Sequence, residues 1–110
     1  MFVVIGVWHL DPALDEVRRG LMSDLVAGVA HAPGIVKGYW AADAADPTRS
    51  HTFIVFEDRA SAEAFAADVR SNLENQARAG VTSVSLDVAE VSFTTLPAGP
   101  AYDLPEKWLC

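Results

Sequence analysis

The chain has 110 residues, of which 51% are hydrophobic and 21% charged, and 15 acidic against 8 basic side chains give it a formal net charge of −7 at pH 7. This length suits one domain, and the composition is typical of a globular protein and excludes a disordered one. The negative charge excludes the basic footprint with which nucleic-acid-binding proteins displace counterions, so we expect no nucleic-acid partner.

The single cysteine, Cys110, excludes an intrachain disulfide and a zinc site built on a cysteine cluster. The three histidines are scattered, so we expect no metal site. The apolar run 2–8 has no basic segment before it and is too short to span a bilayer, and no stretch of 18 apolar residues follows. We therefore expect a cytoplasmic protein with no membrane partner.

The first third of the chain predicts a strand and then a helix. Residues 2–10 are rich in β-branched and aromatic side chains, as strands are. Asp11 and Pro12 suit the N-cap and the first position of a helix that runs to about His31. Apolar residues three or four apart predict its buried face: Leu14, Val17, Leu21, Leu25 and Val29. Charged residues fall mostly on the opposite side of the helix: Arg18, Arg19 and Asp24.

Two strands and a turn follow this helix. Pro33-Gly34 ends the helix, because proline does not continue it and glycine adopts the dihedral angles of a helix end. Residues 35–42 predict the second strand and residues 43–48 a turn. Residues 50–57 predict the third strand, with an apolar centre at 53–56.

The last third predicts a second helix and a fourth strand. Ser61 suits the N-cap of this helix, with Asp58 as the alternative, and Gly80 suits its end. The same three-to-four spacing predicts its buried face: Ala62, Phe65, Val69, Leu73 and Ala77. Residues 82–94 predict the last strand.

The element order is therefore β-α-β-β-α-β, which indicates an α+β, ferredoxin-like fold. This order predicts a four-stranded antiparallel sheet, with strands in the order 4-1-3-2 and both helices on one face. We expect one domain over residues 1–96 and a C-terminal tail over residues 97–110.

The strands are apolar on both faces, which predicts a partner. In the first strand, Val4 and Trp8 alternate with Ile5 and Val7. Two helices cover one face only, and the other would expose more apolar surface than soluble monomers usually tolerate. We expect a homodimer through the sheet face opposite the helices. In the alternative, the tail with Leu104 and Trp108 folds over its own sheet and the chain stays monomeric.

Two stretches carry a resemblance to a known family. Residues 32–36, Ala-Pro-Gly-Ile-Val, open the second strand, and residues 53–57, Phe-Ile-Val-Phe-Glu, precede an alanine-rich helix that begins with residues 61–65. With the element order, they make residues 2–95 resemble the antibiotic biosynthesis monooxygenase (ABM)-like domains of the dimeric α+β barrel superfamily. The resemblance implies a dimeric α+β barrel, in a family that includes cofactor-free quinone-forming oxygenases and haem-degrading enzymes.

Three positions depart from that family's pattern. Arg59 stands where many relatives carry Trp, and residues 59–80 contain no His, which is common there. Val7 stands where the haem-degrading branch uses Asn. The iron ligand of that branch has no counterpart here, so we expect neither haem nor another cofactor.

His9 and His51 are the candidate catalytic residues. A cofactor-free oxygenase needs a base to form a phenolate or enolate, and histidine is the natural base at neutral pH. His9 ends the first strand and His51 lies near the start of the third, so an antiparallel pairing brings both to one edge of the sheet. The ordinary alternative for each is a solvated histidine at a strand end.

Tyr39, Trp40 and Arg49 are the candidate substrate-binding residues, around a cavity either between helices and sheet or within the barrel. Sheet packing or a dimer contact would equally explain the two aromatic residues, and solvent exposure would explain Arg49. We expect a cofactor-independent monooxygenase-like protein that acts on a small aromatic or polyketide-like molecule. The alternative is a non-enzymatic homodimer that binds a small apolar ligand or serves as an assembly module.

Overall fold

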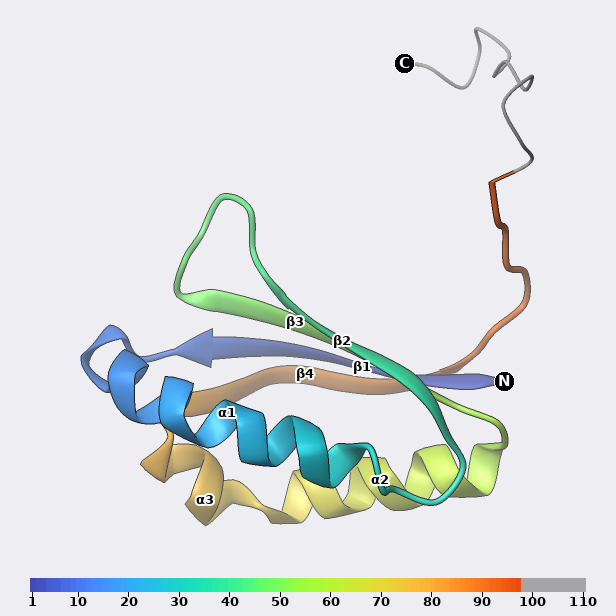
Figure 1. Cartoon of the computed structure of the whole chain (residues 1–110), viewed down its shortest axis with the longest axis horizontal. Helices are drawn as coiled ribbons and strands as arrows, with labels where there is room; N and C mark the ends of the chain where they lie inside the picture. Colours follow the sequence, from blue (N-terminus) through green and yellow to red (C-terminus); the bar gives the residue numbers. More distant parts are fainter. Residues whose placement is uncertain (98–110) are drawn as a thin grey trace, which may run out of the picture.

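The structure, a computed structural model, describes residues 1–97. It contains β1 (Phe2–Leu10), the 3-10 helix η1 (Pro12–Leu14), α1 (Asp15–Val29), β2 (Ile35–Ala42), β3 (Arg49–Phe56), α2 (Arg59–Ser71), α3 (Leu73–Arg78) and β4 (Val81–Glu90). The strands form one antiparallel sheet in the order β2-β3-β1-β4, and the α-helices lie on one of its faces (Figure 1). The predicted α+β, ferredoxin-like fold and strand order are confirmed.

The predicted tail, residues 97–110, lies outside the described residues except for Pro97. Leu104 and Trp108, which the monomeric alternative uses, therefore also lie outside them. The boundary between domain and tail therefore stays a prediction. In the described part of the chain, no helix is both long enough and apolar enough to cross a membrane.

The first helix begins as predicted at Asp11, but with a tighter first turn. The Asp11 carboxylate accepts a hydrogen bond from the Ala13 amide at 3.0 Å, which supplies a partner for one of the free N–H groups of a helix start. The turn that follows is the 3-10 helix η1, and α1 begins only at Asp15.

The second predicted helix is two helices in the structure. Asp58, and not Ser61, is its N-cap, since the Asp58 carboxylate accepts from the Ser61 amide at 2.8 Å. Asn72 leaves the helical conformation, with φ −93° and ψ 36°, and separates α2 from α3. This break rotates the face of α3, so the predicted burial of Leu73 and Ala77 is wrong: Leu73 is 63% exposed and Ala77 is also exposed.

The last strand ends four residues earlier than predicted, at Glu90. In the β1–β4 pairing Glu90 lies opposite Phe2, the first residue of β1. Only one further bond follows, from the Val91 amide to the Met1 carbonyl at 2.9 Å. Within residues 1–97 no strand lies beside residues 92–94 to accept hydrogen bonds, so the ladder stops.

The core lies between the sheet and α2. Val4, Ile54 and Phe56 from the strands pack against Ala62 and Ala66 of α2, and all five are buried. The Phe56 ring also packs on the Phe65 ring, with centroids 5.1 Å apart. We call this side of the sheet the inner face.

The opposite side, which we call the outer face, carries the alternate residues of the same strands. Ile5 of β1 and Tyr39 of β2 both lie opposite Phe53 of β3, and Val3 lies opposite Val55. Tyr39 is 57% exposed and Phe53 is 39% exposed. Within residues 1–97 no helix covers this face (Figure 1). Apolar side chains on both faces of the sheet are therefore a feature of the structure as well as of the sequence.

Candidate functional site

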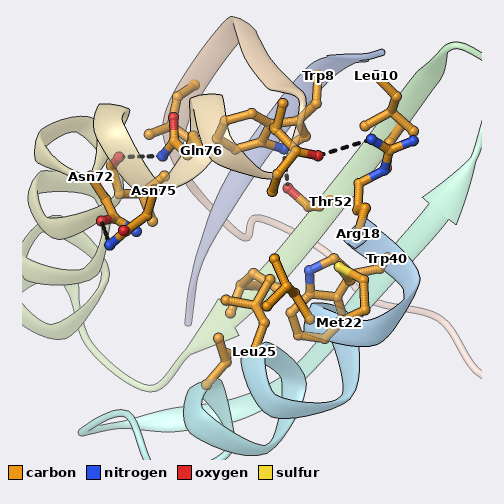
Figure 2. A pocket seen from close by; sticks show the side chains of 18 of the residues that line it. Trp8, Leu10, Arg18, Met22, Leu25, Trp40, Thr52, Asn72, Asn75 and Gln76 are labelled. Carbon is orange, nitrogen blue, oxygen red and sulfur yellow. Dashed lines mark hydrogen bonds between the residues drawn. The ribbon is translucent and has the colours of Figure 1, made fainter. Parts of the chain in front are cut away.

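A cavity of about 400 Å³ lies between the inner face of the sheet and the helices. Residues of β1, β2, β3, β4 and all three α-helices line it, and Figure 2 shows their side chains arranged around the open space. Leu21 and Leu25 of α1 line the cavity and stay about half exposed, because α1 does not close directly onto the sheet. The volume and the apolar lining are those of a small-molecule site.

Two tryptophans form the sheet side of the cavity, and each depends on a glycine. A Cβ atom on Gly6 would lie 2.5 Å from Trp8 Nε1, and one on Gly38 would lie 3.1 Å from the Trp40 ring and 2.9 Å from Ile54 Cδ1. Each glycine precedes its tryptophan by two residues and therefore shares its face of the strand. The indoles lie over the glycines and present flat apolar surfaces to the cavity.

Thr52 supplies a polar group beside Trp8. Its hydroxyl oxygen accepts a hydrogen bond from Trp8 Nε1 at 3.1 Å, and Thr52 is 9% exposed. Since a hydroxyl both accepts and donates, this bond leaves the Thr52 proton available to a carbonyl or an oxyanion in the cavity.

A second polar group comes from the break between α2 and α3. Asn72, Asn75 and Gln76 line the cavity at this end (Figure 2). The Gln76 amide nitrogen donates to the Val69 carbonyl at 2.7 Å, and the Asn75 amide donates to Asn72 at 2.8 Å. The Val69 carbonyl also accepts from the Asn72 amide at 3.2 Å, so Gln76 adds a second donor there, and the break brings carboxamides to the cavity.

Arg18 is the one charged side chain among the described residues that line the cavity. It is 8% exposed, so the expectation that it lies on the exposed side of the helix is wrong. It donates to the carbonyls of Asp11 at 3.3 Å and Ala79 at 3.0 Å, and it forms an ion pair with Asp15. These acceptors draw the side chain inward, because a buried cation is stable only when it is paired and hydrogen-bonded.

The predicted site residues lie on both sides of the sheet. Trp40 lines the cavity, whereas Tyr39 lies on the outer face. His9 lies directly opposite Arg49, and His51 lies opposite Val7, so these three share one end of the outer face. The two histidines are neighbours as predicted, but the sheet separates them from the cavity. Neither is placed to act as a base on a ligand bound there, and their catalytic role stays a prediction for a site on the outer face.

His51 has a structural partner in the β2–β3 turn. Its Nε2 lies 2.7 Å from Asp43 Oδ1, and Asp43 Oδ2 accepts from the amides of Ala45 and Asp46 at 3.0 and 2.8 Å. The bond with His51, followed by those two amides, lowers the pKa of Asp43 to about 2. The pair fixes the turn to the start of β3.

This lowered pKa predicts that the turn weakens in acid. A carboxyl whose pKa is lower in the folded than in the unfolded chain stabilises the fold above its unfolded pKa, here 3.8, and this contribution is lost as the pH falls toward 2. Asp43→Asn should therefore be less stable than wild type at pH 6, with the difference shrinking between about pH 4 and pH 2. Urea unfolding at a series of pH values measures this, with the exposed Asp24→Asn as control. A difference that stays constant to pH 2 would contradict the assignment.

The sequence prediction missed Trp8, Thr52, Arg18 and Gln76. One signal was available: Gly6-Val7-Trp8 and Gly38-Tyr39-Trp40 share a Gly-x-Trp pattern, which at strand period places a glycine beside each indole. A second signal places Arg18: it lies four residues after Leu14 and three before Leu21, so helical spacing puts it on the same face. Thr52 depends on Trp8, 44 positions away, and Gln76 depends on the break at Asn72. Among residues 1–97, no three His, Cys, Asp or Glu side chains lie together in a way that would hold a metal ion.

Solved structures share this arrangement of elements. A Deinococcus radiodurans protein provisionally described as an antibiotic biosynthesis monooxygenase is similar over 90% of this chain and 100% of its own, with a TM-score of 0.73 and 13% identity. SnoaB, a cofactor-independent oxygenase from Streptomyces nogalater, is similar over 84% of this chain and 94% of its own, with a TM-score of 0.66 and 17% identity.

A third solved structure is the ActVA-Orf6 monooxygenase of Streptomyces coelicolor, in complex with nanaomycin D. It is similar over 88% of this chain and 92% of its own, with a TM-score of 0.62 and 18% identity.

The chain has the ABM fold. The resemblance seen in the sequence is confirmed at this level. No protein-family model and no curated protein matches the sequence. Since the identities are low, the comparison establishes the ABM fold and not a reaction.

Proposed function

We propose that this chain is a cofactor-independent monooxygenase-like protein that binds a small aromatic or polyketide-like molecule in the cavity between sheet and helices. The observation that carries the proposal is the cavity itself: about 400 Å³, floored by two indoles and lined by apolar residues with a few polar groups. Flat ring systems stack on aromatic side chains and fit such a volume.

The reaction needs no external reductant. In a substrate of the anthrone type, a CH₂ group between two aromatic rings is oxidised by O₂ to a carbonyl. One oxygen atom enters the product, and the other leaves with both hydrogens as water. The apolar lining would reduce the number of water molecules around the reacting carbon, and the Thr52 hydroxyl would donate to the substrate oxygen that gains negative charge on ionisation.

The similar structures support this assignment without establishing it. SnoaB is described as a cofactor-independent oxygenase, and ActVA-Orf6 is a monooxygenase whose structure holds nanaomycin D. Their ABM fold matches the fold of this chain, while their 17–18% identity leaves the chemistry to be measured.

Oxygen consumption tests the proposal. We expect purified protein with anthrone to consume O₂ above the rate of the protein-free blank, with one anthraquinone formed per O₂, as followed by an oxygen electrode and chromatography. Thr52→Val removes the hydroxyl and nearly preserves the shape, so it should lower this rate by about tenfold or more. Ser92→Val, an exposed control outside the cavity, should leave the rate unchanged. A wild-type rate equal to the blank would contradict the oxygenase.

One observation favours the alternative of a binding protein without catalysis. Among the described residues that line the cavity there is no His, Asp or Glu to serve as a base. A non-enzymatic protein would bind anthraquinone, as seen by quenching of tryptophan fluorescence, and consume no O₂ with any of these compounds. The two measurements together separate the functions.

We also propose that two copies of the chain pair through the outer face. Phe53 and Tyr39 would be exposed in a single copy, although aromatic side chains of this size usually gain free energy by burial. Phe53→Lys places a charge near the middle of this face, and it should convert a dimer to monomers in analytical ultracentrifugation at micromolar concentration. Leu73→Lys, at an exposed residue of α3, should leave the dimer intact. A wild-type chain that sediments as a monomer would contradict the pairing.

A further inference from the structure

Arg18 has hydrogen-bond donors that the described chain does not use. Its three hydrogen bonds go to the carbonyls of Asp11 and Ala79 and to the carboxylate of Asp15. A guanidinium carries five N–H donors. Within residues 1–97 the structure shows no acceptor for the remaining two. Because Arg18 lines the cavity, these donors are available to a ligand.

The surroundings of Arg18 favour a negative ligand group. Its only carboxylate partner within residues 1–97, Asp15, is 57% exposed, so solvent screens that charge more than it screens the buried guanidinium. The other lining residues are apolar or carry uncharged hydroxyl and carboxamide groups. In such low-dielectric surroundings, a cation attracts an anion more strongly than it would in water.

We propose that the cavity takes ligands whose apolar ring system carries one anionic oxygen group, and that Arg18 binds this group. The proposal rests on the ligand cavity of the proposed function and concerns its specificity. Aromatic carboxylates and ionised phenols or enols share this chemistry. The ring system then lies against Trp8 and Trp40, and the oxygen group lies at Arg18, which Figure 2 shows among the side chains around the cavity. The net charge of −7 repels anions in general, so a preference for an anion requires a specific site.

Two probes of matched shape test the charge requirement. At pH 7, 2-naphthoate is an anion and 2-naphthamide is neutral. We expect wild-type protein to bind the naphthoate about tenfold more tightly in isothermal titration calorimetry, as a charge-assisted hydrogen bond allows. Arg18→Gln should remove this preference and leave naphthamide binding nearly unchanged. Equal binding of the two probes to wild-type protein would overturn the proposal.

A matched control and a second variant keep the test decisive. Arg19→Gln makes the same charge change at an exposed residue of α1, and it should leave the preference intact. Because Arg18→Gln also removes bonds to two backbone carbonyls, Asp15→Asn is the second variant. It removes the competing carboxylate and leaves Arg18 in place, so naphthoate affinity should rise about threefold with naphthamide affinity unchanged. Unchanged or weaker naphthoate binding by Asp15→Asn would overturn the proposal.

A third probe, 2-naphthol, distinguishes phenolate ligands from carboxylate ligands. It is titrated by absorbance from pH 7 to pH 10 in the presence of the protein. A lowered pKa of the bound naphthol assigns phenolates to the site as well, and an unchanged pKa restricts it to carboxylates. None of these measurements involves oxygen chemistry, so their failure is distinct from failure of the oxygenase reaction. If neither naphthalene probe binds, the ligand cavity of the proposed function fails too.

Discussion

Replacing Phe56 with alanine is expected to destabilise the folded chain by about 3–5 kcal/mol, the range found when a buried aromatic side chain is removed from a core. Phe56 is 0% exposed and is the largest fully buried side chain described. It lies under α2, where it contacts the Phe65 ring and the cluster around Ala62 and Ala66. A domain of this size has a total stability of roughly 5–15 kcal/mol, so this one change removes a large share of it.

Urea unfolding followed by circular dichroism measures this loss. Phe93→Ala is the matched control, because Phe93 is 95% exposed and its truncation should change the free energy of unfolding by less than about 0.5 kcal/mol. Equal effects of the two substitutions would show that β3 does not present Phe56 to the helices, and the inner-face assignment of the whole sheet would then be wrong.

Gly6→Ala, at the one glycine of β1, should disrupt the cavity. The new Cβ would lie 2.5 Å from Trp8 Nε1 and 2.6 Å from Thr52 Oγ1, closer than real side chains approach. The indole must move, and the hydrogen bond from Trp8 to Thr52 breaks. We expect a destabilisation of about 1–3 kcal/mol from overpacking and at least a tenfold weaker binding of anthraquinone or naphthoate.

Gly20→Ala is the control for the Gly6 variant. A Cβ at Gly20 meets nothing within 4 Å, and the residue lies inside α1. Since alanine favours the helix over glycine, this variant should gain about 0.5–1 kcal/mol of stability with unchanged ligand binding. Thermal unfolding and fluorescence titration of both variants provide the comparison. Normal ligand affinity in Gly6→Ala would contradict the position of the cavity.

Much of the fold follows from local sequence signals. The strand at residues 2–10 and the cap at Asp11 each depend on neighbouring residues, and the structure agrees with them. The first helix ends at Val29, before the predicted stop at Pro33-Gly34. The end of β4 does not depend on such signals. Val91 and the residues after it resemble a strand, but β1 offers them no partner beyond Met1. A strand exists only where another strand accepts its hydrogen bonds.

The candidate site was harder to predict, because both faces of the sheet are apolar. A two-residue period shows that Gly6 and Trp8 share a face, and that His9 lies on the other face, but it does not show which face meets the helices. The prediction therefore grouped Tyr39 with Trp40, two adjacent residues that lie on opposite sides of the sheet. Arg18 was assigned to the opposite side of the first helix, although it lies four residues after Leu14 and three before Leu21 and so shares their face. The carbonyls of Asp11 and Ala79 that accept its hydrogen bonds lie outside its own helix.

The element order, the antiparallel ferredoxin-like sheet and the two apolar faces of its strands follow from local signals, because caps, turns and residue periodicity act over a few neighbouring residues. Contacts in the folded chain were needed to find that Asn72 divides the second helix and that Arg18 pairs with the Ala79 carbonyl. They were also needed to find that Trp8 and Trp40 line a cavity which the two strand histidines do not reach. Those features depend on contacts between segments up to about 60 residues apart, such as Arg18 with Ala79, which no local pattern specifies.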